Sequence, residues 1–176
     1  MNPLSIREMS EDILKVMEYL GLSAAAIAGF KGGGLTALAF AVNHPDKVDS
    51  LIISDIYANA SGLHTKPLLK LYFRQILCTF GAVFSKKAVL EKQVLDLMLS
   101  QVFLRGLDLA KIKAEVLITV LDDTPIKHSH IRFMSECIKN AEVQIIPGKD
   151  KAPQDYPEEY SAIITDFLRR YNTQYG

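Results

Sequence analysis

The glycine-rich segment 29–34 contains one side chain able to do chemistry, the amine of Lys31. It follows an apolar run at 24–28 and precedes helix-forming residues at 35–42, so the sequence predicts a strand, a tight turn and a helix. A lysine at that helix start lies beside free backbone N–H groups and the positive end of the helix dipole, where together they can hold a carboxylate or phosphate. The segment is not a phosphate-binding P-loop, because Lys31 precedes the glycines and no G-K-(S/T) follows.

Two other interpretations of Lys31 stay open. The same positive field favours the neutral amine that Schiff-base chemistry requires, which would make Lys31 a nucleophile. Alternatively, Lys31 is a solvated side chain with no chemical role. The candidate ligand-binding residues of this turn are Gly29, Phe30, Lys31, Gly32 and Gly33.

The chain's histidines and cysteines do not indicate a metal site. His128 and His130 lie two residues apart near a predicted helix start, so their side chains point in different directions. The two cysteines are too few and too far apart for a disulfide framework or a zinc site. No metal and no cofactor is expected. We expect packing or surface roles for His44, His64, His128, His130, Cys78 and Cys137.

Alternating strands and helices must position these candidates. An amphipathic helix is predicted at 5–20, where Ser5 and Glu8 have the spacing of a capping box. Short apolar runs bounded by turn residues predict buried strands, and helical patterns lie between most of them. The fold class is therefore α/β, a parallel sheet of about four strands with flanking helices. The predicted strands are 24–28, 48–53, 115–121 and 143–146, and the later helices are 35–42, 129–140 and 157–171.

An all-helical insert interrupts this alternation at about 57–113, within a single domain spanning 1–176. Its apolar side chains have three interpretations: they cover the sheet, line a pocket for an apolar ligand, or form a surface for a partner subunit. Covering the sheet is the simplest of these. The apolar residues concerned are Leu68, Leu69, Leu71, Tyr72, Phe73, Ile76, Phe80, Val83 and Phe84.

The order of these features resembles the α/β-hydrolase-fold superfamily. That family has a G-x-S-x-G turn between a strand and a helix, like segment 29–34 here, and a P-(D/E)-x-V helix exit, like 45–48. A helical cap follows, as predicted at 57–113, and Asp123 falls where the family's third strand carries the acidic member of its triad. The segment 157–168 resembles the family's closing helix. The resemblance spans nearly the whole chain, which corresponds to the C-terminal two-thirds of a protein of this family.

The same resemblance implies that the catalytic chemistry is degenerate. Lys31 stands at the position of the nucleophilic serine, and an ammonium group cannot replace a hydroxyl in acyl transfer. The loop that carries the family's histidine has no imidazole, with Asp150 or Lys151 at its position. The backbone N–H of Gly32 is retained, but the second oxyanion donor comes from an earlier loop that this chain does not have. Asp123 is then a remnant of the triad, which we expect to pair with Lys151 or Lys31.

The fold's earlier strands have no counterpart in this sequence, so the strand at 24–28 is expected to have an open edge. Pairing of that edge with a second copy would make one continuous sheet. The partner expected from this argument is a second identical chain, in a homodimer through strand 24–28.

Composition excludes several function classes. The formal net charge is zero and the sequence pI is about 6.9, so no basic surface indicates nucleic acid. No apolar run is long enough to span a membrane, the N-terminus lacks a signal-peptide pattern, and a cytoplasmic location is expected. The favoured hypothesis is a pseudoenzyme that binds a small anionic or apolar ligand or a partner subunit. The alternatives are an esterase- or lipase-like enzyme with altered chemistry, and a truncated product of a longer hydrolase.

Overall fold

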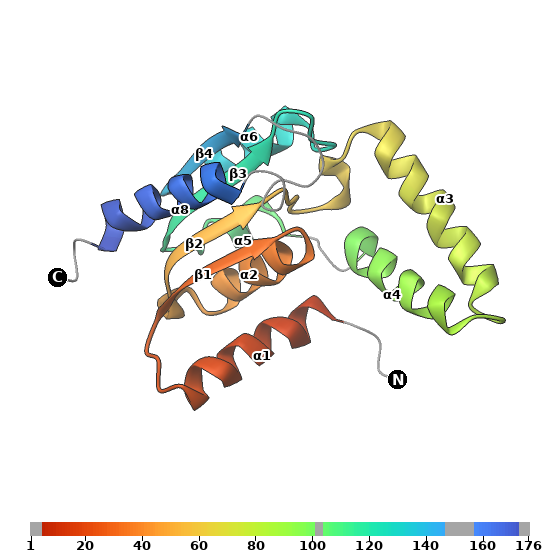
Figure 1. The fold of residues 1–176 in the computed structure, drawn as a ribbon, viewed down its shortest axis with the longest axis horizontal. Coiled ribbons are helices and arrows are strands. Elements are labelled where there is room, and N and C mark those ends of the chain that lie inside the picture. The colour runs from red at the N-terminus through yellow and green to blue at the C-terminus, as the bar shows by residue number, and fades with distance from the viewer. Residues whose placement is uncertain (1–4, 101–103, 147–156, 173–176) are drawn as a thin grey trace.

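The computed structural model describes residues 5–100, 104–146 and 157–172. Their four strands form one parallel sheet in the order β1-β2-β3-β4, which confirms the predicted fold class. The strands are β1 (Ala25–Phe30), β2 (Val48–Ser54), β3 (Glu115–Leu121) and β4 (Ala141–Ile146). Because all four run in the same direction, their carboxyl ends meet at one edge of the sheet, where the turns that follow β1, β2 and β3 lie together (Figure 1).

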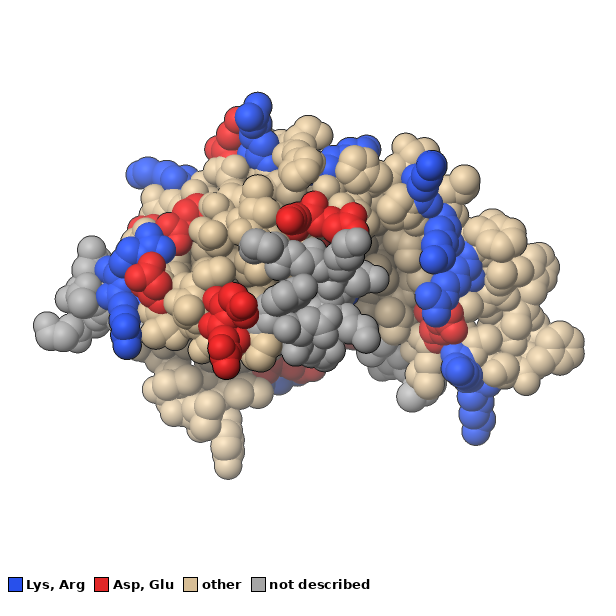
Figure 2. All heavy atoms as spheres, turned by 45° about the horizontal axis from the view of Figure 1, so that its top comes forward, with Lys and Arg blue, Asp and Glu red and all other residues tan. Residues whose placement is uncertain are grey.

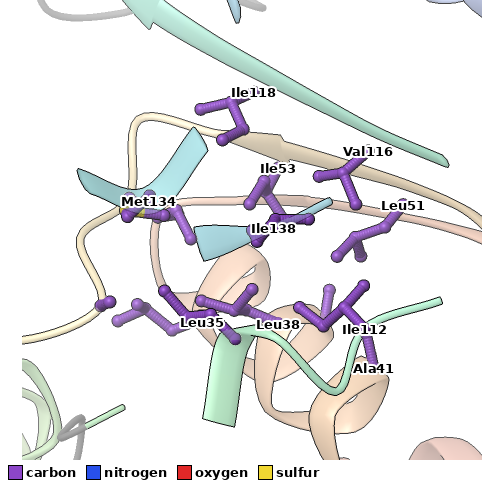
Figure 3. Packing of buried hydrophobic residues seen from close by; sticks show 14 of the residues in the cluster. Leu35, Leu38, Ala41, Leu51, Ile53, Ile112, Val116, Ile118, Met134 and Ile138 are labelled. Carbon is purple, nitrogen blue, oxygen red and sulfur yellow. The ribbon is translucent and has the colours of Figure 1, made fainter. Parts of the chain in front are cut away.

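Helices cover both faces of the sheet (Figure 1). On one face, Leu35 and Leu38 of α2 (Gly32–Asn43) pack toward Ile53 of β2 and Ile118 of β3 (Figure 3). On the other, Phe167 of α8 packs against the central strands. The two central strands are buried along almost their whole length, and each has a central apolar segment, 51–53 in β2 and 116–118 in β3. The remaining helices of these layers are α1 (Ile6–Tyr19), α5 (Gly106–Leu109), α6 (His128–Cys137) and α8 (Pro157–Asn172), with short 3₁₀ turns η1 (Pro45–Lys47) and η2 (Ala60–Gly62).

Several element boundaries differ from the sequence predictions. The first strand continues two residues beyond the predicted 24–28, because Gly29 and Phe30 stay in register with Ile53 and Ser54 of β2. Helix α2 begins at Gly32 rather than at 35, so the glycines form its first turn. At the start of α1, the predicted cap is present in part: the Ser5 hydroxyl accepts a hydrogen bond from the Glu8 N–H at 3.5 Å.

Two long helices between β2 and β3 form a hairpin that projects away from the sheet (Figure 1). They are α3 (Thr65–Gly81) and α4 (Lys86–Ser100), and their faces contact one another along the hairpin. Leu68 and Leu71 pack against the main core as expected. The expectation that the other apolar residues of this segment cover the sheet is wrong, because these side chains are exposed: Leu69, Tyr72, Phe73, Ile76, Phe80, Val83 and Phe84.

Both cysteines are free thiols, Cys78 buried and Cys137 half-buried, in agreement with the predicted packing role. Among the helices that the structure describes, none has the length and apolar composition needed to cross a membrane. The described residues also contain no group of three His, Cys, Asp or Glu side chains arranged to hold a metal ion.

Candidate functional site

Lys31 lies in a strained turn between β1 and α2. Its φ angle is 49° and its ψ angle is −116°, a backbone conformation that residues other than glycine rarely adopt. Two backbone bonds hold it: its N–H donates to the carbonyl of Ser54 at 3.0 Å, and its carbonyl accepts from the N–H of Leu35 at 3.0 Å. The side chain is thereby exposed at the carboxyl edge of the sheet, with its amine 5.0 Å from the centre of the Phe30 ring.

Close approach of the strand to the helix explains two of the glycines around Lys31. A Cβ on Gly29 would lie 2.5 Å from the carbonyl carbon of Gly33, and one on Gly34 would lie 2.5 Å from a methyl carbon of Ile56. By contrast, a Cβ on Gly32 or Gly33 would meet no atom of the described residues within 4 Å. Gly29 therefore lets the backbone of β1 touch that of α2, while neither Gly32 nor Gly33 is needed for such a contact with the described part of the chain.

Asp55 is a residue of this site that the sequence analysis missed. It directly follows β2, and it shares with Lys31 a positive φ angle, here 53°. Its backbone N–H donates to the carbonyl of Thr119 at 2.9 Å, and its carboxylate accepts a hydrogen bond from the Thr124 hydroxyl at 2.9 Å. Its position just after a predicted strand was visible in the sequence, but its proximity to Lys31 comes from the pairing of β1 with β2.

Of the two other predicted catalytic positions, only Asp123 is among the described residues, and it does not join this site. Asp123 is exposed in the turn after β3, beside Asp122, and neither lines the cavity at Lys31. The ion pairs of the described residues do not join Asp123 to Lys31, and the Asp123 side chain is exposed. Lys151, and with it the expected pairing of Asp123 with Lys151, lies outside the described residues.

A cavity of about 530 Å³ lies above the Lys31 turn, between the sheet edge and the α3–α4 hairpin. That volume is in the range of cavities that enclose a small organic molecule. Most of its walls are apolar, and they come from α1, the hairpin and the loops that follow β2 and β3. The apolar lining residues are Ile6, Met9, Tyr57, Leu63, Pro67, Leu71, Val94, Leu97, Met98, Pro125 and Ile126.

Charged groups interrupt these walls at a few points. Lys31 contributes at the glycine turn, Lys70 and Arg74 contribute from α3, and Asp55 is the one carboxylate among the described lining residues. The Arg74 guanidinium also pairs with Glu91 of α4, which joins the two helices of the hairpin. Cations therefore outnumber anions around an otherwise apolar space, an arrangement suited to a molecule with an apolar body and an anionic group.

Tyr57 ties the hairpin to the sheet. It is buried just beyond β2, and its hydroxyl donates to the backbone carbonyl of Met98 in α4 at 3.1 Å. Burial raises the pKa of Tyr57 to about 12. The phenol is therefore a neutral donor throughout the ordinary pH range. Its hydrogen bond to Met98 fixes the part of the cavity wall that α4 contributes.

Three buried hydroxyls lie on the opposite face of the sheet. Thr119 donates to the Ser54 hydroxyl at 2.6 Å, and its oxygen lies 2.7 Å from that of Tyr160 in α8. Burial raises the pKa of Tyr160, although its hydrogen bonds to Ser54 and Thr119 oppose that effect. None of the three lines the cavity, so they fix α8 to the sheet below the Lys31 turn.

Two histidines, His130 and His44, have structural roles. His130 is buried, and its Nε2 accepts a hydrogen bond from the backbone N–H of Ala58 at 3.1 Å. Burial, assisted by the charge of Lys127, lowers the pKa of His130. His44 ends α2 and lies 3.1 Å from the Glu11 carboxylate. No histidine is among the described residues that line the cavity.

Comparison with known sequences identifies a family. The sequence profile described as "alpha/beta hydrolase fold" matches residues 2–112. A putative carbamate hydrolase RutD of a Caulobacter species is 27% identical over 198 aligned positions, which cover 95% of this chain and 74% of that protein. A homoserine O-acetyltransferase of Thermus thermophilus is 33% identical over 51 residues, 29% of this chain and 13% of that protein.

Solved structures share the fold at low sequence identity. A putative non-heme bromoperoxidase, BpoC of Mycobacterium tuberculosis, superposes with a TM-score of 0.78 at 17% identity, covering 97% of this chain and 76% of that one. The α/β hydrolase enzyme MGS-M2 from a Medee basin deep-sea metagenome library gives a TM-score of 0.74 at 18% identity, covering 96% and 73%. The chain thus spans about three-quarters of the length of these proteins.

Proposed function

Since this chain belongs to the α/β-hydrolase fold family, we propose that it uses the family's site to bind a small molecule with an apolar body and one anionic group, without serine-type turnover. The single observation that carries this proposal is the cavity of about 530 Å³ over the Lys31 turn, whose described side chains are mostly apolar and include three cations and one carboxylate. In this proposal the apolar walls hold the body of the ligand. Lys31 and the backbone N–H groups of the first turn of α2 face its anionic group.

The residue types at the turn support the proposed absence of turnover. Lys31 occupies the position at which the family has its serine, and the described residues lining the cavity include no imidazole to accept a proton. Asp123, which the family resemblance assigns as the triad acid, is exposed in its own turn. In this proposal it has no catalytic role, and Lys151 is likewise not a proton acceptor.

Competition binding tests the ligand class. Anilinonaphthalene sulfonate, a fluorescent probe with an apolar body and one sulfonate, is displaced by decanoate and, separately, by decanol, which has the same chain without the charge. Decanoate should compete about tenfold better, and Lys31→Gln should remove that difference, because the loss of a charge-assisted contact costs about 1.5 kcal/mol. Lys139→Gln, which removes an exposed lysine outside the cavity, is the matched control. Equal competition by the acid and the alcohol in the unmutated protein would rule out the anionic part of the proposal.

A second candidate function is an enzyme with altered chemistry. The observation in its favour is that Lys31 and Asp55, an amine and a carboxylate, line one cavity from the ends of neighbouring strands. Hydrolysis of short p-nitrophenyl esters, and of a p-nitrophenyl carbamate because of the carbamate hydrolase relative, tests it. Turnover that Lys31→Ala abolishes and Lys139→Ala leaves intact would establish this candidate over simple binding.

We also propose the homodimer through the edge of β1. In the described sheet β1 pairs on one side with β2, and its residues are only partly buried. Pairing with β1 of a second copy would complete that edge. Multi-angle light scattering at micromolar concentration should report twice the chain mass, and Ile27→Pro, which removes a backbone donor in β1, should give the monomer. A monomer for the unmutated protein would refute the dimer.

A further inference from the structure

The α3–α4 hairpin has a large apolar surface that faces away from the cavity. The outward face of α3 has exposed apolar residues at helical spacing, and the turn at the hairpin tip continues this surface with Val83, 78% exposed, and Phe84, 90% exposed. Scattered apolar residues are normal on a protein surface, but a continuous set of this kind marks an interaction site. Its members are Leu69, Tyr72, Phe73, Ile76, Leu77, Phe80, Val83 and Phe84, which we call the outer hairpin face.

Positive charge borders this face. Lys66, Lys70 and Arg74 recur every fourth residue of α3, so they form one stripe along the helix, directly beside the outer hairpin face. Lys86 and Lys87 follow the tip at the start of α4. Figure 2 shows Lys and Arg side chains gathered in a column on this side of the molecule, next to a broad uncharged surface.

The charge is concentrated in this part of the chain. Residues 64–100 contain six Lys and Arg but two Asp and Glu, whereas the whole chain has 20 of each. Both acids of the hairpin are already neutralised, Glu91 by Arg74 and Asp96 by Lys92, the latter at 2.6 Å. The hairpin therefore has an excess of lysine over acid, and the rest of the protein is correspondingly acidic.

We propose that the hairpin binds an anionic lipid surface, with the outer hairpin face in the headgroup region and Lys66, Lys86 and Lys87 against the lipid phosphates. Amphipathic helices that lie in this region combine exposed Phe and Leu with neighbouring Lys or Arg. In α3 the cationic stripe lies beside the exposed apolar residues in the same way. The exposed aromatic rings are of the kind that favour the membrane–water boundary, and long lysine side chains reach past apolar surface to water. A second copy of the chain would need an acidic, apolar patch to match the hairpin. An anionic lipid surface supplies both negative charge and an apolar region, so it needs no such patch on a partner protein.

Flotation with lipid vesicles tests this directly. The unmutated protein should float with vesicles containing about 30% phosphatidylserine in phosphatidylcholine and bind at least tenfold less to phosphatidylcholine alone, since each lysine near an anionic surface adds roughly fivefold. Raising the salt concentration should release it, because screening shortens the reach of the charges.

Two variants and a control separate the apolar and ionic contributions. Val83→Ser with Phe84→Ser should lower vesicle binding about tenfold or more through lost apolar burial. Lys66→Gln with Lys86→Gln and Lys87→Gln should do so only for the anionic vesicles. The control is Tyr19→Ser with Leu20→Ser, which removes exposed apolar side chains from the end of α1 and should leave binding unchanged.

Several outcomes would overturn the lipid surface as the occupant. Failure of the unmutated protein to float would do so, as would equal loss in the α1 control. A dimer in vesicle-free solution that Val83→Ser with Phe84→Ser converts to monomer would assign the face to a second copy. Circular dichroism confirms that each variant is folded, and decanoate binding without vesicles is measured in parallel, so failure of the cavity proposal and of the lipid proposal are distinguishable.

Discussion

The backbone N–H of Lys31 donates to the carbonyl of Ser54 at 3.0 Å, one residue past the end of β1. The β1–β2 ladder therefore continues into the turn and holds Lys31 in its positive-φ conformation. The strain of the turn is balanced by the pairing of the two strands, and the amine is placed at the sheet edge as a result. The free-energy cost of the positive φ angle at Lys31 can therefore be measured by substitutions at this position.

Lys31→Gly should stabilise the protein by about 1 kcal/mol. Relief of a strained φ/ψ combination is worth about 1–3 kcal/mol, from which the greater freedom of glycine in the unfolded chain subtracts about 0.5–1 kcal/mol. Urea unfolding measures the change. Lys31→Ala is the control: it removes the same side chain but keeps a Cβ, so it should alter the free energy of unfolding by less than about 0.5 kcal/mol. Equal stabilities of the two variants would show that the turn is unstrained.

Gly29→Ala should destabilise the protein by about 2–3 kcal/mol, because overpacking forces the backbone apart. The added methyl would lie 2.5 Å from the carbonyl carbon of Gly33, and neither partner is the end of a flexible side chain. Gly33→Ala is the matched comparison in the same turn. Its Cβ meets no atom of the described residues within 4 Å, and alanine favours a helix, so Gly33→Ala should be neutral or stabilising by up to about 1 kcal/mol.

Thermal unfolding of both glycine variants checks this contrast. A similar loss for each would mean that the strand and the helix are not in close contact at Gly29. A loss of thermal stability for Gly33→Ala alone would show that Gly33, and not Gly29, is the glycine in close contact.

The buried His130 predicts a loss of stability on mild acidification. Its pKa in the folded protein is lowered from the ordinary value of 6.5, so between that lowered pKa and about 6.5 the unfolded chain binds more protons than the folded one. The stability contributed by the neutral imidazole is therefore complete above about pH 6.5 and falls as the pH decreases toward the lowered pKa.

Urea unfolding at about pH 7.5 and about pH 5.5 measures this loss, and His130→Gln isolates it. Glutamine keeps an acceptor for the Ala58 N–H but does not titrate. The unmutated protein should lose more stability between the two pH values than the variant does. An identical pH dependence of the two proteins would contradict the assignment of the effect to His130.

The sequence predicted the sheet and the Lys31 turn because both depend on local signals. Apolar runs bounded by turn residues marked the strands, and glycine spacing placed Lys31 at the strand-to-helix junction. Asp55 was missed because its proximity to Lys31 depends on strand order, which brings the end of β2 beside the end of β1. Local sequence contains no record of that pairing.

The faces of α3 could not be assigned from sequence for a different reason. Apolar residues occur on both sides of this helix, with Leu68 and Leu71 turned to the core and Phe73 and Phe80 exposed. Periodicity identifies a buried face only when the opposite face is polar. The position of the hairpin relative to the sheet decides which side is buried, and that position results from tertiary contacts.

Tyr57 gives the hairpin a fixed point. Its bond to the Met98 carbonyl lies near the sheet end of α4, while the tip residues Val83 and Phe84 lie at the far end of both helices. For any small rotation of the hairpin about this fixed point, displacement grows with distance, so the tip moves most and the wall beside Met98 moves least. A single hairpin thus connects the cavity wall near Met98, where displacement is smallest, to the exposed apolar tip, where displacement is largest.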